Sequence, residues 1–139
     1  MSYKFRKNAA LTALVLYWGL ILTLTSLPQA NMPNVQTNDK VSHFLAYLGL
    51  AFLLYAYLRL RRGFNSDKKK LIIIVIATAS LYGALDELHQ LFVPGRSADV
   101  IDWIADTLGA IAGIILITGI EKYLPSLFMG NEAADTGNG

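Results

Sequence analysis

The sequence lacks cysteine and has few charged residues. Of its 139 residues none is cysteine, four are proline, two are histidine and 16% are charged. The absence of cysteine excludes disulfide frameworks and thiolate-bound zinc or iron–sulfur sites. With 54% hydrophobic residues, the composition is too apolar for an ordinary soluble domain. The length allows one compact domain, and with a net charge of only +2 we expect no nucleic-acid partner.

Long apolar runs make up most of the chain, at about residues 9–27, 41–58, 71–91 and 100–120. Each is long enough to cross a bilayer as a helix. The third run opens with β-branched residues at 72–76, which favour a strand in soluble proteins, but within a bilayer only helices and closed barrels satisfy the backbone. The first run could instead belong to a cleaved signal peptide. Its length and the runs that follow favour a transmembrane helix that is retained.

These runs predict an all-α membrane protein, a compact antiparallel bundle of four transmembrane helices. The bundle would occupy residues 1–124, and the polar, small-residue segment 125–139 is predicted to be a disordered tail.

The basic residues predict the orientation of the bundle in the membrane. Three precede the first run, six lie between residues 59 and 70, and Lys122 follows the fourth run, which makes ten on one side. Only Lys40 and Arg96 fall on the other side. We therefore predict a multi-pass protein of the cell membrane with both termini and the 59–70 loop in the cytoplasm.

A polar stretch joins the third and fourth runs. It contains a Pro94-Gly95 turn. Polar residues lie on both sides of this turn: Asp86, Glu87, His89, Gln90, Arg96, Asp99, Asp102 and Asp106. An ionisable group within a membrane segment is costly and is usually functional or tightly paired. At about 1.5 Å per residue, Glu87, Asp106 and His43 all fall about 21–24 Å from the cytoplasmic ends of their helices. Three helices are thus predicted to deliver polar groups to one depth, toward the extracytoplasmic side.

The spacing of the fourth run places its acids on one face. Residues 99, 102, 106, 109 and 113 are separated by three, four, three and four positions, which gives one stripe on a helix. Gly109 and Gly113 form a G-x-x-x-G pattern, which allows another helix to approach closely. On the second run, His43 and Tyr47 are four residues apart, with Lys40 three before His43.

Structural interpretations of these residues are the alternative. Asp99 and Asp102 also suit the N-terminal cap of the fourth helix. His89 suits a position at the membrane interface. Arg96 paired with Asp86 or Glu87 would be a buried ion pair in a purely structural polar core.

Three motifs in order resemble the VanZ-like family. They are D-K-x-x-H-F-x-x-Y from Asp39, D-E-x-x-Q-x-F-x-P-G-R from Asp86, and D-x-x-x-D-T-x-G-A-x-x-G from Asp102. The family consists of small bacterial membrane proteins named for a member associated with resistance to the glycopeptide teicoplanin. The resemblance implies a membrane location and a link to the cell envelope, without an established activity. The family pattern often has asparagine where this chain has Asp106.

Three functions are compatible with these patterns. The favoured hypothesis is an outward-facing polar pocket that binds or modifies an envelope lipid or a lipoglycopeptide-type ligand, with a link to glycopeptide tolerance. Its predicted ligand-binding residues are His43, Tyr47, Asp86, Glu87, Gln90, Arg96, Asp102 and Asp106. The alternative is a membrane-embedded enzyme that acts on an envelope lipid by acid–base or metal-assisted chemistry, with Glu87, Asp86, His43 and Asp106 as candidate catalytic residues. A small transporter is the third.

We expect no metal and no cofactor, because Glu87-Leu88-His89 lacks the H-E-x-x-H spacing of a helical zinc site. The expected partners are membrane lipids or a lipid-linked envelope component.

Overall fold

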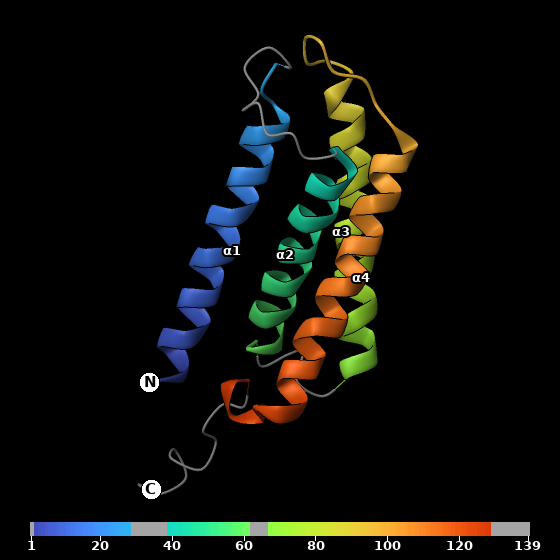
Figure 1. The fold of residues 1–139 in the computed structure, drawn as a ribbon. Helices are drawn as coiled ribbons and strands as arrows, with labels where there is room; N and C mark the ends of the chain where they lie inside the picture. The colour runs from blue at the N-terminus through green and yellow to red at the C-terminus, as the bar shows by residue number, and fades with distance from the viewer. Residues whose placement is uncertain (1, 29–38, 62–66, 129–139) are drawn as a thin grey trace, which may run out of the picture.

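The computed structural model describes residues 2–28, 39–61 and 67–128. These form four α-helices, α1 (Tyr3–Thr25), α2 (Asp39–Arg59), α3 (Lys68–Gln90) and α4 (Val100–Tyr123), followed by a 3-10 turn, η2 (Pro125–Leu127). All four α-helices are long and apolar enough to span a membrane. The helices run alternately up and down side by side (Figure 1), and the described residues contain no strand. The predicted all-α bundle of four transmembrane helices is therefore confirmed.

Two boundaries differ from those predicted. The helix α1 begins at Tyr3 instead of near residue 9, after Ser2, whose hydroxyl accepts a hydrogen bond from the Phe5 amide at 3.3 Å. The polar start of the chain does not break this helix, since long basic side chains can reach water while their stems stay at the membrane surface. Within the segment predicted to be disordered, η2 is ordered and Phe128 is buried; residues 129–139 lie outside the described part.

Helices α2 and α4 make the most extensive contact in the bundle. The glycine pattern on α4 explains it: a Cβ atom added at Gly109 would overlap the backbone carbonyl of Phe44, and one added at Gly113 would overlap that of Leu48. Only glycine allows the two backbones to lie this close. The predicted role of the G-x-x-x-G pattern is confirmed, and α2 is the helix that approaches it.

The centre of the bundle is apolar, and so is most of its outer surface. The buried core includes Leu50, Leu54, Val75 and Ile117. Large apolar side chains also cover the outside, where a bilayer would contact them. Helix α1 buries only Leu14 and Ile21 and is the peripheral helix of the bundle.

A set of polar contacts joins the helices at the end of the bundle where α1 begins and α4 ends (Figure 1). Buried Glu121 accepts hydrogen bonds from Tyr55 at 2.7 Å, Arg59 at 2.6 Å and Lys68 at 2.8 Å. The Tyr3 hydroxyl donates to the Leu60 carbonyl, which ties α1 to the end of α2. Three helices thus converge on one carboxylate, a role for Glu121 that its sequence position did not indicate.

Candidate functional site

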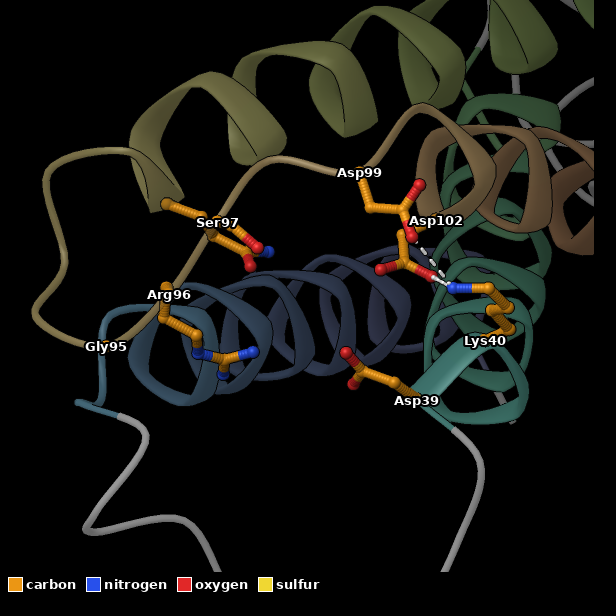
Figure 2. A pocket seen from close by; sticks show the side chains of 8 residues that line it. Asp39, Lys40, Gly95, Arg96, Ser97, Asp99 and Asp102 are labelled. Carbon is orange, nitrogen blue, oxygen red and sulfur yellow. Dashed lines mark hydrogen bonds and ion pairs between the residues drawn. The ribbon is translucent and has the colours of Figure 1, made fainter.

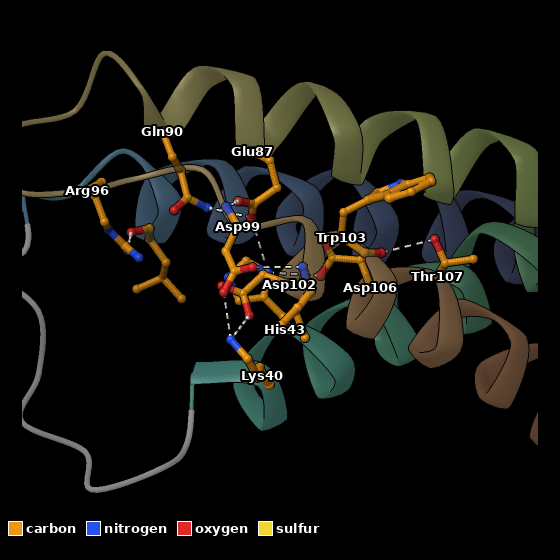
Figure 3. A network of polar contacts seen from close by, with 12 residues as sticks. Lys40, His43, Glu87, Gln90, Arg96, Asp99, Asp102, Trp103, Asp106 and Thr107 are labelled. Carbon is orange, nitrogen blue, oxygen red and sulfur yellow. Dashed lines mark hydrogen bonds and ion pairs between the residues drawn. The ribbon is translucent and has the colours of Figure 1, made fainter.

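The polar residues gather at the opposite end of the bundle, where α2 begins, α3 ends and α4 begins (Figure 3). This end contains most of the polar side chains that are buried in the described part of the chain: His43, Asp86, Glu87, Gln90, Asp102 and Asp106. The depth estimate from the sequence placed Glu87, Asp106 and His43 at one level, and the structure brings these three together.

His43 lies between two carboxylates. Its Nδ1 atom is 3.0 Å from Oδ1 of Asp106 and 3.8 Å from Oε1 of Glu87. The side chain of Asp106 is fully buried, and those of His43 and Glu87 are only 7% and 8% exposed. His43, Glu87 and Asp106 come from α2, α3 and α4 respectively, and we call them the His43 cluster. Their position depends on the close approach of α2 to α4, since Asp106 lies one turn before Gly109 and His43 directly precedes Phe44.

Glu87 also holds the connection between α3 and α4. Its Oε2 atom accepts a hydrogen bond from the backbone amide of Asp99 at 2.7 Å, and its Oε1 atom accepts one from Gln90 at 3.3 Å. The contacts described for Glu87 are therefore with His43, Gln90 and Asp99, not with Arg96. The structural alternative, an ion pair of Arg96 with Asp86 or Glu87, is not among the contacts of the described residues, because the Pro94-Gly95 turn carries Arg96 toward α1. The hydrogen bonds described for Arg96 go to the carbonyls of Leu24 and Leu27, at 3.4 and 3.5 Å.

Lys40 forms ion pairs with two acids of the α4 stripe. Its Nζ atom is 2.9 Å from Oδ2 of Asp99 and 3.0 Å from Oδ1 of Asp102. Asp99 also caps α4, since its Oδ1 accepts a hydrogen bond from the Ile101 amide at 2.8 Å. The hydrogen bonds from Lys40 and from Ile101 lower the pKa of Asp99 below its ordinary value. The capping interpretation is confirmed for Asp99, which also takes part in the ion pairs.

An open polar pocket of about 310 Å³ lies above the His43 cluster. Its wall consists of Asp39, Lys40, Gln90, Gly95, Arg96, Ser97, Asp99 and Asp102. Figure 2 shows Arg96 and Lys40 reaching it from two sides. Of the predicted ligand-binding residues, Gln90, Arg96 and Asp102 line this pocket. His43, Glu87 and Asp106 form the cluster below it, and Tyr47 and Asp86 are buried deeper.

Some buried polar atoms at this end have no hydrogen-bond partner among the described residues: the hydroxyls of Tyr47 and Tyr82, Oδ2 of Asp86 and Oδ2 of Asp106. The Tyr47 side chain is only 1% exposed and lies one turn below His43 on α2. Buried polar groups are nearly always hydrogen-bonded, so each such atom needs an explanation.

Sequence reasoning missed two residues of the pocket, Asp39 and Ser97. Asp39 and Ser97 line the wall but were not singled out, although Asp39 opens the motif that contains His43. The spacing of Lys40 three residues before His43 did indicate a shared face. His89, expected at the interface, is exposed and lies 3.1 Å from the hydroxyl of Ser26 on the side of α1.

Comparison with known protein families gives a match over most of the chain. The model of the VanZ/LLP1 family matches residues 4–121, which include all four helices and both polar ends of the bundle. No curated protein and no solved structure was found to match the chain. Since the family model covers most of the chain, this four-helix membrane protein belongs to the VanZ/LLP1 family.

Proposed function

We propose that this protein binds the polar headgroup of an envelope lipid, or of a lipid-linked envelope compound, at the extracytoplasmic end of its helix bundle. The observation that carries the proposal is the position of the 310 Å³ polar pocket at the end of an otherwise apolar bundle. An amphipathic ligand can place its headgroup in such a pocket while its tail remains beside the apolar helix surface.

The charges of the pocket suit a headgroup that has both anionic and hydrogen-bond-donating groups. Arg96 presents a planar guanidinium, which is well suited to a phosphate or a carboxylate. Asp39, Asp99 and Asp102 supply acceptors for hydroxyl or amino groups. A sugar phosphate or a peptide attached to a lipid carrier has this combination, and a lipoglycopeptide belongs to the same chemical class.

The orientation rests on the distribution of basic residues. The structure places the start of α1, the end of α2, the start of α3 and the end of α4 at one end of the bundle (Figure 1). Ten of the twelve basic residues belong to these segments and the loop between α2 and α3. By the positive-inside rule this end is cytoplasmic, which leaves the pocket on the extracytoplasmic side.

The second candidate function is acid–base catalysis on the bound compound. The contact between His43 and Asp106 at 3.0 Å favours it, because a buried carboxylate can orient an imidazole for proton transfer. Transport receives no support from the described residues. Between the His43 cluster and Glu121 most of the described core consists of apolar side chains such as Leu50, Leu54 and Val75.

Lipid analysis of the purified protein tests the proposal. The protein is extracted in mild detergent, and bound lipids are identified by mass spectrometry beside those of an unrelated four-helix membrane protein. We expect a headgroup class that is enriched with the wild type and lost with Arg96→Met. Arg61→Met is the matched control, since it removes the same charge from an exposed position at the other end. No enriched class, or equal enrichment in both variants, would refute the proposal. A tolerance assay with a glycopeptide on the same strains tests the wider link to resistance.

A further inference from the structure

We infer that the His43 cluster is a binding site for a divalent transition-metal ion, with Zn²⁺ or Mn²⁺ as the fitting class, held by His43, Glu87 and Asp106. One ligand atom from each residue lies within 4.8 Å of the other two. The inference deepens the proposed function and rests on it for the role of the ion, whereas its test measures the ion without any lipid.

The distances suit a metal centre after small shifts. In a tetrahedral site with bonds of about 2.0–2.1 Å, neighbouring ligand atoms lie about 3.3 Å apart. The Nδ1 atom of His43 is 3.0 Å from Asp106 and 3.8 Å from Glu87, so one distance lies below and one above this value by less than 0.6 Å. The third pair of ligand atoms, on Glu87 and Asp106, lies within 4.8 Å. One imidazole with two carboxylates is a donor set for Zn²⁺ or Mn²⁺, since imidazole favours transition metals over Mg²⁺ and Ca²⁺.

The charge balance at this end of the bundle also calls for a cation. Six carboxylates lie there, against the two permanent cations Lys40 and Arg96: Asp39, Asp86, Glu87, Asp99, Asp102 and Asp106. Residues 29–38, which precede them, have no charged side chain. Four of the six acids are buried, and the ion pairs described for Lys40 include one of these, Asp102. Buried charges are generally paired or bound to metal ions.

A separate observation comes from Tyr47, one turn below His43 on α2. Its hydroxyl is buried and has no hydrogen-bond partner among the described residues. The Oδ2 atom of Asp106 also has no such partner. An ion with a bound water would give the tyrosine a partner, because a metal-bound water can donate and accept hydrogen bonds.

Two further carboxylates lie near His43. Such a histidine usually donates its second ring N–H to a carboxylate, which fixes the ring. A ring nitrogen of His43 lies within 4.8 Å of carboxylate oxygens of Asp39 and Asp102. Both acids also line the pocket above, so an ion in the cluster would lie directly beneath the proposed headgroup. Its remaining coordination position would face a phosphate or a water.

Zinc binding by the detergent-purified protein tests this inference. The full chain is purified without a polyhistidine tag, treated with chelator and dialysed against Zn²⁺, and bound metal is measured by plasma mass spectrometry. We expect about one Zn²⁺ per chain for the wild type, as for a folded single site, and at least about a tenfold weaker binding for His43→Gln and Asp106→Asn. His89→Gln is the matched control, because His89 is the other histidine and is exposed outside the cluster. Equal binding by His43→Gln and His89→Gln, or none by the wild type, would overturn the inference.

A spectroscopic measurement keeps the inference testable if His43→Gln or Asp106→Asn fails to fold. X-ray absorption at the zinc edge is recorded on His89→Gln, in which His43 is the remaining histidine. We expect one imidazole and oxygen ligands at about 2.0–2.2 Å. A spectrum without an imidazole contribution would refute the site. These results do not depend on the lipid analysis. If the wild type binds lipid but no zinc, the metal site alone is refuted. If the wild type binds zinc but no enriched lipid, headgroup binding alone is refuted.

Discussion

Replacing Gly109 by alanine tests the contact between α2 and α4 that brings His43 to Asp106. The new methyl group would overlap the backbone carbonyl of Phe44. Because that atom belongs to the helix backbone, a change of rotamer cannot relieve the overlap, and the two helices must move apart. Overpacking of this kind costs about 1–3 kcal/mol, and the rigid partner places this case near 3 kcal/mol.

A matched substitution on the same helix isolates that cost. Gly119→Ala makes the same chemical change on α4, but a Cβ atom there meets nothing within 4 Å. Alanine is favoured over glycine within a helix by about 0.5–1 kcal/mol, and this gain applies to both variants. We therefore expect Gly119→Ala to be slightly more stable than the wild type and Gly109→Ala to be less stable by about 2 kcal/mol.

Equilibrium unfolding in mixed detergent micelles, followed by circular dichroism, measures both variants. Their difference removes the helix-propensity gain and leaves the packing cost, about 3 kcal/mol. Equal stabilisation of both variants would refute the close approach of α2 and α4. Separation of these helices would also lengthen the 3.0 Å contact between His43 and Asp106, so Gly109→Ala should weaken zinc binding while Gly119→Ala should not.

Other predictions concern the two ends of the bundle. Glu121→Gln should destabilise the protein by about 2–3 kcal/mol in the same unfolding assay, because it leaves buried donors without their charged acceptor. The exposed substitution Lys122→Gln should be neutral, and equal effects of the two would contradict the network at this end. Asp99 has a lowered pKa in the folded protein, so its ion pairs contribute stability above pH about 4 that is lost as the pH falls further. Melting temperatures between pH 7 and pH 3 should therefore fall less for Asp99→Asn than for the wild type, and parallel curves would exclude this role. A membrane-impermeant thiol reagent applied to whole cells should label Ser97→Cys but not Arg61→Cys, and the reverse pattern would place the pocket on the cytoplasmic side.

The helices and the polar region could be predicted from the sequence for a physical reason. A bilayer leaves no partner for an open backbone, so an apolar run of sufficient length has to be helical, whatever its local propensity. This is why residues 72–76 lie within α3 despite five β-branched side chains. The helical period similarly placed Asp102, Asp106 and the two glycines on one face of α4.

The choice of partners was decided by tertiary structure alone. Periodicity assigns a face to each helix, but not the rotation and offset of its neighbours, and ion pairs depend on shifts of a few ångströms. Periodicity allowed Arg96 to pair with Asp86 or Glu87, yet the turn before Arg96 directs it to the carbonyl groups of Leu24 and Leu27. The amide of Asp99 and the ring of His43 face Glu87 instead. In the same way, the position of Glu121 in the last turn of α4 did not predict its three partners on two other helices. They meet at Glu121 only because α2 and α4 end, and α3 begins, at the same level of the bundle.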